Sequence, residues 1–410
     1  MATTDRSYKT SHPWLTFRLD AGRFSPQFWL LLGEAKSKCE HISNAPMFPE
    51  VRDKLHTMAL TKGIRGTTAI EGNSLTEEQV RQAIEGELEL PRSKEYLRQE
   101  IDNIVEAWNG MLDTVVNGGD TKLSTERICA MNAQILKDLP LSDTTVVPGE
   151  IRTYGVGVLR YKAAPAQDCH HLLKRYCDWL NEDWTPEGEI WPDNCRLHFT
   201  IVKAVMAHLY FTWIHPFGDG NGRTARLIEA QILLSAGAPS AVCHLLSDYY
   251  NETRSLYYNH LHHASAAWGR DGELAIRPFL EYALRGLVEK EVEQIRELER
   301  QQQIIIWRDY VHRAFSTMTP SEAQKRRRQL AILVGVKQLN AQVKQAPLKR
   351  RELFELMPAA YRQKSDRTIS RDINELIKME LFKEVQVGYL ARTEALQGLV
   401  SKRYDPETEN

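Results

Sequence analysis

The sequence has almost no net charge, few cysteines and no long apolar run. Its 410 residues carry 53 Lys and Arg against 54 Asp and Glu, a formal net charge of −1, so the chain as a whole is not suited to bind a polyanion. Its 6 cysteines are scattered without a Cys-x-x-Cys pair, which argues against a disulfide framework and a zinc site. We see no signal peptide and no run of membrane-spanning length. We therefore expect a soluble protein of the reducing cytoplasm with no membrane partner.

The sequence also lacks the Gly-Lys-Ser/Thr of a Walker loop, yet one segment has the features of a phosphate site. Residues 215–226, which we call the signature segment, read His-Pro-Phe-Gly-Asp-Gly-Asn-Gly-Arg-Thr-Ala-Arg and lead into a run of helical character. A glycine-rich backbone that enters a helix presents free N–H groups and the positive end of the helix dipole. Such an end is suited to bind phosphate.

The side chains of the signature segment add to this prediction. Arg223 and Arg226 are one helical turn apart and bring positive charge to the same end. Asp219 would be unfavourable beside phosphates unless it holds a divalent cation. His215 is the natural proton acceptor near neutral pH. A glycine-rich turn with two solvated arginines is the simpler interpretation, but it does not explain the histidine and the carboxylate.

This segment closely resembles the signature of the Fic family, His-x-Phe-x-(Asp/Glu)-Gly-Asn-Gly-Arg-x-x-Arg, with every fixed position filled. The family transfers a nucleotide monophosphate, usually AMP from ATP, to a hydroxyl side chain of a protein. The resemblance implies that His215 deprotonates the target hydroxyl and that Asp219 holds Mg²⁺. It further implies that the backbone of residues 218–222 cradles the α- and β-phosphates, that Asn221 contacts the α-phosphate, and that the two arginines bind the outer phosphates. The nucleotide-binding residues implied in this way are Glu71, Phe217, Gly218, Asp219, Gly220, Asn221, Gly222, Arg223, Thr224 and Arg226, with Phe217 as the anchor of the loop in the core.

A second informative segment lies upstream, where Gly72 and Asn73 are expected to end a helix. Ser74 or Thr76 can then cap the next helix. Residues 67–71 therefore occupy a last helical turn, where a carboxylate is electrostatically disfavoured and needs a cationic partner. A solvated Glu71 before a turn is the alternative.

This second segment resembles the inhibitory motif of the Fic family, Ser/Thr-x-x-x-Glu-Gly/Asn, with Thr67, Glu71 and Gly72 in register. The resemblance implies that Glu71 pairs with Arg226 and displaces the γ-phosphate of ATP into an unproductive pose.

Residues 147–161 form the strand-like region of the first 300 residues, since β-branched and aromatic residues alternate there with glycines. We predict a short hairpin, for which a surface hairpin without a role is the alternative. The region resembles the target-docking flap of the Fic family, which implies that Tyr154, Val156, Gly157 and Val158 hold the target by strand addition. Residues 162–165 depart from the family pattern, so a target preference does not carry over.

We predict a mainly α protein, with a Fic-type helical bundle, a β-hairpin flap and a small C-terminal winged helix (α+β) domain. The predicted boundaries are 1–120 for an N-terminal helical region with the inhibitory motif, 121–270 for the catalytic domain, 271–340 for a helical linker and 341–400 for the winged helix. Residues 194–214 are expected to form a buried helix. The basic run 325–328 is expected to be a solvated helix face.

The C-terminal domain resembles a winged helix with residues 368–376 as its recognition helix. Arg367, Thr368, Ser370 and Arg371 could then reach DNA phosphates or bases, whereas many such domains bind proteins instead. Both partners stay open.

The leading functional prediction is protein adenylylation, with ATP as substrate, Mg²⁺ as cofactor, and a target protein or the chain itself as acceptor. Two alternatives remain: a DNA-binding regulator that uses the Fic fold as a sensor or scaffold, and an enzyme that removes AMP with Glu71 activating water. A homodimer is also left open, because the sequence does not reveal the oligomeric state.

Overall fold

The computed structural model describes residues 6–18, 24–141, 143–158, 161–182, 195–341, 346–358 and 364–396. The chain divides into two compact units, Met1–Ile295 and Arg296–Asn410, with the division inside helix α14 (Arg277–Ser316). Each unit has its own hydrophobic core. The four-part division of the sequence stays a prediction.

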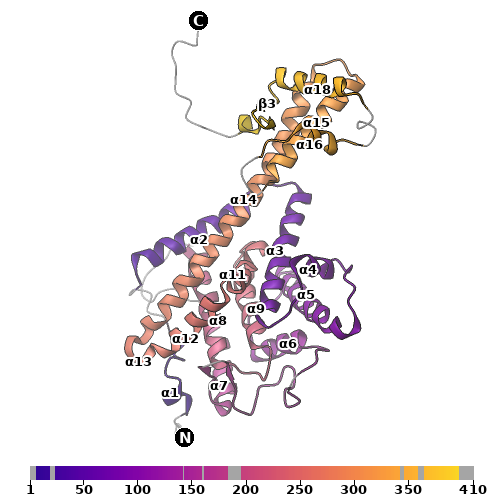
Figure 1. Ribbon diagram of the computed structural model, residues 1–410. Helices are drawn as coiled ribbons and strands as arrows, with labels where there is room; N and C mark the ends of the chain where they lie inside the picture. Colours follow the sequence, from indigo (N-terminus) through magenta and orange to yellow (C-terminus); the bar gives the residue numbers. More distant parts are fainter. Residues whose placement is uncertain are drawn as a thin grey trace. The chain divides into compact units, whose positions relative to one another are not determined.

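The first unit is mainly helical, as predicted (Figure 1). Ser25, Thr76 and Ser124 cap their helices by accepting a bond from a backbone N–H, so Thr76 rather than Ser74 begins the helix after the inhibitory motif. The α-helices that open within this unit, before α14, are α1 (Tyr8–Ser11), α2 (Pro26–Asn44), α3 (Pro49–Ile70), α4 (Glu77–Ile84), α5 (Glu95–Val116), α6 (Thr125–Ile135), α7 (Ala166–Asn181), α8 (Arg196–Ile214), α9 (Asn221–Ser235), α10 (Ser240–Cys243), α11 (Leu245–Glu252), α12 (Arg254–Ala266) and α13 (Trp268–Asp271).

Helices α8 and α9 form the middle of this unit (Figure 1), and the loop between them is the signature segment. Helix α8 is apolar around most of its circumference, and by length and composition it could cross a membrane. Our expectation that no run reaches that length was therefore wrong, but 72% of its most apolar window is buried inside the protein, as in a core helix. Asn194, expected to begin this helix, lies outside the described residues.

The predicted hairpin is shorter than the strand pattern suggested. Strands β1 (Gly157–Val158) and β2 (Tyr161–Lys162) pair antiparallel, with Gly157 opposite Lys162. Upstream of them, Ile151 forms an isolated bridge with Phe217 and the N–H of Arg152 bonds to Pro216. Most of residues 147–156 therefore have irregular structure and lie against the signature segment, so they do not extend the hairpin.

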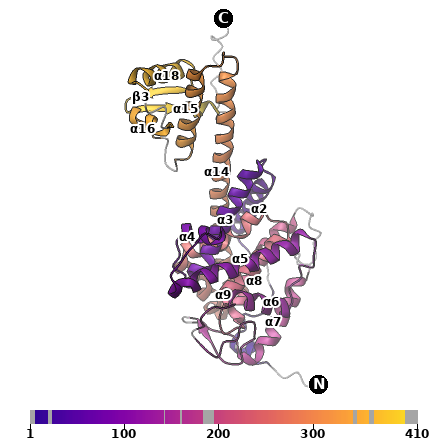
Figure 2. The ribbon, with the colours of Figure 1, turned by 90° about the vertical axis from the view of Figure 1, so that its right-hand side faces the viewer.

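The second unit contains the end of α14, helices α15 (Glu322–Leu339), α16 (Arg350–Leu356) and α18 (Asp366–Lys378), and a two-stranded sheet. Strands β3 (Phe382–Val385) and β4 (Gly388–Ala391) pair antiparallel beside α15 and α18 (Figure 2). The helices and the sheet lie where a winged helix was expected, although residues 342–345, 359–363 and 397–400 of that domain lie outside the described residues. The assignment as a winged helix stays a prediction.

The basic run 325–328 is not simply a solvated face. The Nε atoms of Arg326 and Arg327 lie 3.4 and 2.9 Å from the carboxylate of Asp372, which is 1% exposed in α18. The prediction was wrong because the pairing partner lies in a helix about 45 residues further along the chain. These two arginines fix α18 against α15.

All six cysteines are free thiols, so no disulfide links the chain. Among the described residues, no group of three or more His, Cys, Asp or Glu side chains could hold a metal ion.

Candidate active site

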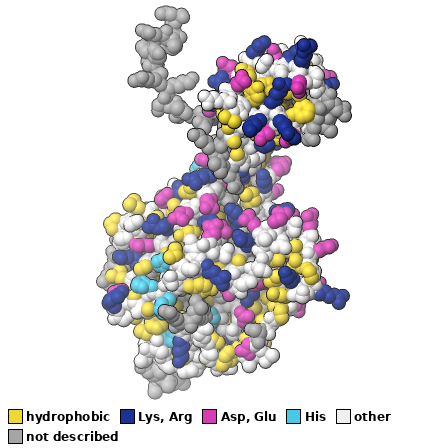
Figure 3. All heavy atoms as spheres, in the orientation of Figure 1, with side chains coloured by type: hydrophobic (Ala, Val, Ile, Leu, Met, Phe, Trp, Pro, Cys, Tyr) yellow, Lys and Arg dark blue, Asp and Glu magenta, His cyan; other side chains and the backbone are white. Residues whose placement is uncertain are grey.

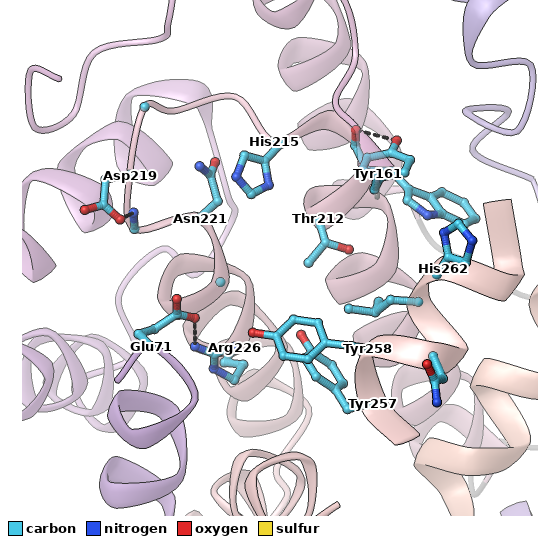
Figure 4. Close-up of a pocket in the computed structure, with 16 residues that line it drawn as sticks. Glu71, Tyr161, Thr212, His215, Asp219, Asn221, Arg226, Tyr257, Tyr258 and His262 are labelled. Carbon is cyan, nitrogen blue, oxygen red and sulfur yellow. Dashed lines mark hydrogen bonds and ion pairs between the residues drawn. The ribbon is translucent and has the colours of Figure 1, made fainter. Parts of the chain in front are cut away.

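A cavity of about 660 Å³ opens over the signature segment (Figure 4), a volume that suits a small-molecule ligand. Charged groups gather at one end, where Glu71, Arg226 and Asp219 lie, while Tyr161 and His262 mark the other end. The lining comes from the end of α3, the end of α8, the α8–α9 loop, the start of α9, and α12. The cavity therefore joins the two sequence segments that were singled out.

His215 ends α8 in the left-handed conformation, at φ 50° and ψ 61°, and its imidazole faces the cavity. Burial, reinforced by the positive charge of Arg152, lowers the pKa of His215 to about 4. The imidazole is therefore neutral at physiological pH and able to accept a proton.

Arg152 is a structural residue of the site that the sequence did not reveal as such. Its guanidinium is buried and donates to the backbone carbonyls of His215 at 2.7 Å, Tyr154 at 2.7 Å and Ala164 at 2.6 Å. One side chain thus ties the flap region to the backbone of His215 and places a positive charge beside the imidazole.

The signature loop is closed by its own asparagine. The side-chain oxygen of Asn221 accepts from the N–H of Phe217 at 3.0 Å, and its amide group donates to the carbonyl of Phe217 at 2.9 Å. Phe217 is 1% exposed, in agreement with its predicted place in the core. The amide of Asn221 therefore holds the loop in this structure, and a contact with the α-phosphate stays a prediction.

Two glycines of the loop are required by space and conformation. Gly220 has φ +75°, and a side chain there would meet Asn132. A Cβ on Gly222 would lie 2.3 Å from Oε1 of Glu71. Asn132 of α6 donates to the carbonyl of Asp219 at 2.9 Å and accepts from the N–H of Gly149 at 2.9 Å. The loop is thus fixed by α6, and Thr224 closes the first turn of α9 by donating to Gly220 at 2.9 Å.

Glu71 and Arg226 form an ion pair across 155 residues of sequence, with Nη2 of Arg226 2.6 Å from Oε1 of Glu71 (Figure 4). Nε of Arg226 also donates to the hydroxyl of Thr67 at 2.7 Å, and Nη2 donates to the carbonyl of Thr67 at 3.0 Å. Burial opposes ionisation of Glu71, but Arg226 and Arg223 outweigh it and hold the pKa of this carboxyl below its ordinary value. The cationic partner that the helix end required is therefore Arg226, whose side chain is 1% exposed. Gly72 follows with φ +109°, which ends the helix as expected.

Arg223 has different partners from those that the sequence suggested. Its Nη1 lies 2.6 Å from Oε1 of Glu100 in α5, and its Nη2 lies 3.2 Å from Oδ1 of Asp219. It is not among the described residues that line the 660 Å³ cavity. The predicted contact between Arg223 and the outer phosphates therefore requires this side chain to move.

Asp219 is the one acidic side chain of the signature loop, and its side chain is 44% exposed. Mg²⁺ is commonly bound through one or two carboxylates together with substrate phosphates and water. A single accessible carboxylate beside a phosphate-binding loop fits that mode of binding, which does not require a cluster of protein ligands.

Helix α12 supplies aromatic side chains to the cavity. Tyr257 and Tyr258 lie beside Arg226, and Leu261 and His262 line the cavity further along the same helix (Figure 4). The hydroxyl of Thr253 donates to the carbonyl of Tyr249 at 2.7 Å and lies 2.6 Å from the hydroxyl of Tyr282. Thr253 is not among the described residues that line the cavity.

Tyr161 is among the described residues that line the cavity, whereas the four predicted flap residues Tyr154, Val156, Gly157 and Val158 are not. The hydroxyl of Tyr154 lies close to Gly218, where an added Cβ would come within 2.4 Å of it. The flap is thus placed against the signature loop, while its docking role stays a prediction.

The part of the chain that holds the signature segment is similar to known proteins. Residues 122–233 match the model of the Fic/DOC family. The chain is 30% identical to protein adenylyltransferase fic-1 of Caenorhabditis elegans over 219 residues, which cover 53% of this chain and 38% of that protein. It is 28% identical to protein adenylyltransferase Fic of Nematostella vectensis over 220 residues, which cover 53% of this chain and 45% of that protein. The chain thus spans less than half the length of these relatives.

Solved structures agree on the fold. A Fic family protein from Desulfovibrio desulfuricans G20 superposes with a TM-score of 0.52 at 21% identity, over 88% of this chain and 92% of that chain. The C. elegans Fic-1 structure superposes with a TM-score of 0.52 at 24% identity, over 67% of this chain and 73% of that chain. Fold and cavity together define a helical protein with a glycine-rich loop that opens into a cavity at the start of α9. Residues 122–233 match the Fic/DOC family model, in agreement with the resemblance of the signature segment.

Proposed function

We propose that this protein transfers AMP from ATP to a hydroxyl group of a target protein or of itself, and releases pyrophosphate. The observation that carries the proposal is the neutral imidazole of His215 in the same cavity as the glycine-rich start of α9 and Arg226. A proton acceptor, a phosphate-binding helix end and a cation are the groups that nucleotidyl transfer needs. The names of its relatives, protein adenylyltransferases, support the same reaction.

In the proposed reaction the target hydroxyl oxygen attacks the α-phosphorus of ATP while His215 accepts the hydroxyl proton. The bond between the α-phosphorus and the bridging oxygen breaks, and pyrophosphate leaves with the electron pair. Backbone N–H groups at the start of α9 bind the phosphates, and the aromatic side chains of α12 that line the cavity contact the nucleoside. Asp219 would hold Mg²⁺, which supplies positive charge to neutralise the phosphates.

Removal of AMP from modified proteins is less well supported, because it requires Glu71 to act as a base. Glu71 is held by Arg226 at 2.6 Å, and its pKa lies below the ordinary value. A carboxylate engaged in this way is a weak base for water. A scaffold without catalysis would have no need for His215 and Asp219 in one loop.

The test of the proposal is incubation of the full chain with labelled ATP, Mg²⁺ and cell lysate, followed by mass spectrometry of labelled proteins. We expect peptides of the chain or of a target that carry AMP on Ser, Thr or Tyr. If neither the chain nor any other protein carries the label, even with the Glu71→Gly variant, the proposal is contradicted.

Substitution of Asp219 by alanine should abolish Mg²⁺-dependent transfer, because no other carboxylate lies within the loop. Asp219→Glu is the matched control, since the signature accepts either acid, and it should retain activity. The measurement is AMP incorporation as a function of Mg²⁺ concentration. An unchanged metal titration curve in Asp219→Ala would assign the metal to other groups.

We further propose that the second unit binds duplex DNA through α18. Lys and Arg side chains are interspersed on the face of this unit in Figure 3. A groove of about 500 Å³ runs along the exposed side of the helix. It is lined by Arg350, Asp366, Arg367, Ser370, Arg371, Asn374, Glu375 and Lys378. Four cations against two acids favour a polyanionic partner.

Arg367→Ala and Arg371→Ala should each weaken binding of the full chain to duplex DNA and reduce its salt dependence by about one unit of slope. Arg351→Ala is the control, because Arg351 is exposed but pairs with Glu355 outside the groove. A gel-shift series over salt concentration measures the effect. Absence of binding even at low salt would leave a protein-docking surface.

The location proposed for the protein is the cytoplasm, where free thiols are maintained. Target choice is proposed to depend on strand addition at the flap, which reads backbone rather than sequence.

A further inference from the structure

Arg223 is held away from the nucleotide cavity by a contact that no sequence motif indicates. It occupies the same end of α9 as Arg226, one helical turn earlier, where both arginines could reach a bound triphosphate. Instead Nη1 of Arg223 lies 2.6 Å from Oε1 of Glu100, and both side chains are nearly buried, at 7% and 10% exposed. Arg226 thus pairs with Glu71, while Arg223 pairs most closely with Glu100 and also contacts Asp219 at 3.2 Å.

A second cavity lies on the far side of these groups. It has a volume of about 230 Å³ and is lined by Arg223, Glu100, Glu71 and Asp219 among others. Glu71 and Asp219 line both cavities, whereas Arg223 and Glu100 line only the second. Arg223 is therefore turned into the neighbouring cavity, and the attraction of Glu100 keeps it there.

The position of Glu100 is in turn fixed by the turn that follows Glu71. The amide of Asn73 donates to Oε2 of Glu100 at 2.9 Å and to the carbonyl of Leu97 at 2.9 Å. Asn73 is buried and lies two residues after Glu71. A displacement of this turn would loosen both carboxylates together, so the two contacts are connected through one short segment.

We propose that Glu100 is a second restraint on nucleotide binding: it holds Arg223 outside the nucleotide cavity, while Glu71 occupies Arg226 inside it. The inference rests on the proposed function and extends it, because it adds a positioning residue from α5 to the inhibitory segment. With both carboxylates in place, neither arginine is free for the outer phosphates. Loss of Glu71 alone releases Arg226 and leaves Arg223 paired.

The test compares ligands with and without outer phosphates. Glu100→Gln removes the charge, keeps the side-chain shape, and still accepts from Asn73. Introduced into the Glu71→Gly background, it should tighten binding of a non-hydrolysable ATP analogue by about tenfold, because a charge-assisted bond no longer competes for Arg223. Binding of AMP, which has no outer phosphates, should be unchanged. The measurement is titration calorimetry of the full chain with Mg²⁺.

Glu106→Gln is the matched control, since Glu106 is an exposed glutamate on the same helix, and it should leave both affinities unchanged. Arg223→Ala added to the double variant should remove the gain for the ATP analogue. If Glu100→Gln does not fold, Glu100→Met fills the same space without charge and serves as the second variant.

Three outcomes separate the hypotheses. Equal affinity for the ATP analogue with and without Glu100, or an equal change for AMP, would overturn the second restraint. Weaker binding of the analogue in Glu100→Gln would also overturn it and assign Glu100 to orient Arg223 for phosphate. If the Glu71→Gly protein binds neither ligand and transfers no AMP, the proposed function itself fails.

Discussion

Replacement of Glu71 by glycine should raise incorporation of AMP by the protein on the order of tenfold or more, although loss of a side chain usually damages an enzyme. The reason is the contact at 2.6 Å between Glu71 and Arg226. Arg226 is the cation that lines the nucleotide cavity, and while the carboxylate holds it, the outer phosphates of ATP cannot use it. The negative charge of Glu71 also repels the triphosphate.

The restraint should persist across the physiological pH range. Arg226 and Arg223 outweigh burial and hold the pKa of Glu71 below its ordinary value. The carboxylate therefore stays ionised at any pH above this lowered pKa, and its negative charge is lost only on strong acidification. The expected ratio of activities between Glu71→Gly and the wild type is therefore the same at pH 6.5 and at pH 8.

The gain should not be offset by misfolding. Glu71 occupies the C-cap of α3, beyond the last full helical turn, where glycine costs at most about 1 kcal/mol. Arg226 keeps its bonds to the hydroxyl and the carbonyl of Thr67, so the released guanidinium is not left without partners. The variant should have nearly the wild-type melting temperature.

The control is the double variant Glu71→Gly, Arg226→Ala, which should be inactive again because the released partner is absent. Glu77→Gly, which removes an exposed carboxylate at the start of α4, should leave incorporation unchanged. The measurement is transfer of labelled AMP to the protein itself. Equal or lower incorporation in a folded Glu71→Gly protein would contradict the inhibitory role of Glu71 and favour a structural or AMP-removing role for this residue.

The signature segment could be predicted because its residues are contiguous and their spacing carries the chemistry. The ion-pair partner of Glu71 could not be predicted from the residue pattern alone. The helix-end position required some cation, but only the resemblance named Arg226, since the two lie 155 residues apart. The contact between Arg223 and Glu100 was not predicted, because the two residues lie 123 positions apart and no motif joins them.

The flap illustrates a limit of strand propensity. β-Branched residues between glycines predicted a hairpin over residues 147–161, but strands need backbone groups free to pair. The N–H of Arg152 bonds to Pro216, and the guanidinium of Arg152 occupies the carbonyls of Tyr154 and Ala164. These tertiary contacts use backbone groups that a longer hairpin would need for its own hydrogen bonds. Only two residues on each strand therefore pair.

Substitution of His215 by alanine should lower the rate of AMP transfer at least about a hundredfold, the usual contribution of a general base. Binding of a non-hydrolysable ATP analogue should change little, because the base acts on the target hydroxyl rather than on the nucleotide. Arg152 also binds the backbone carbonyl at this position, so the loop keeps its attachment in the variant. The decisive readout is therefore a fall in kcat without a comparable change in nucleotide affinity.

The pH profile tests the same residue without a substitution. A general base works in its unprotonated form, and burial together with Arg152 lowers the pKa of His215 to about 4. The sign follows directly: a lower pKa extends the active range toward acid. The value of kcat/KM, which reports the free enzyme, should stay level from about pH 8 to about pH 5. An unperturbed histidine would already lose half its activity near pH 6.5.

Bound nucleotide should shift the acid limb of the pH profile toward higher pH. The negative phosphates beside His215 favour the imidazolium, so the pKa in the complex rises and kcat should begin to fall at higher pH than kcat/KM. His170→Ala, which removes an exposed histidine of α7 outside the cavity, should leave both profiles unchanged. Transfer by His215→Ala at the wild-type rate, or coincident profiles for kcat and kcat/KM, would contradict the assignment of His215 as the proton acceptor.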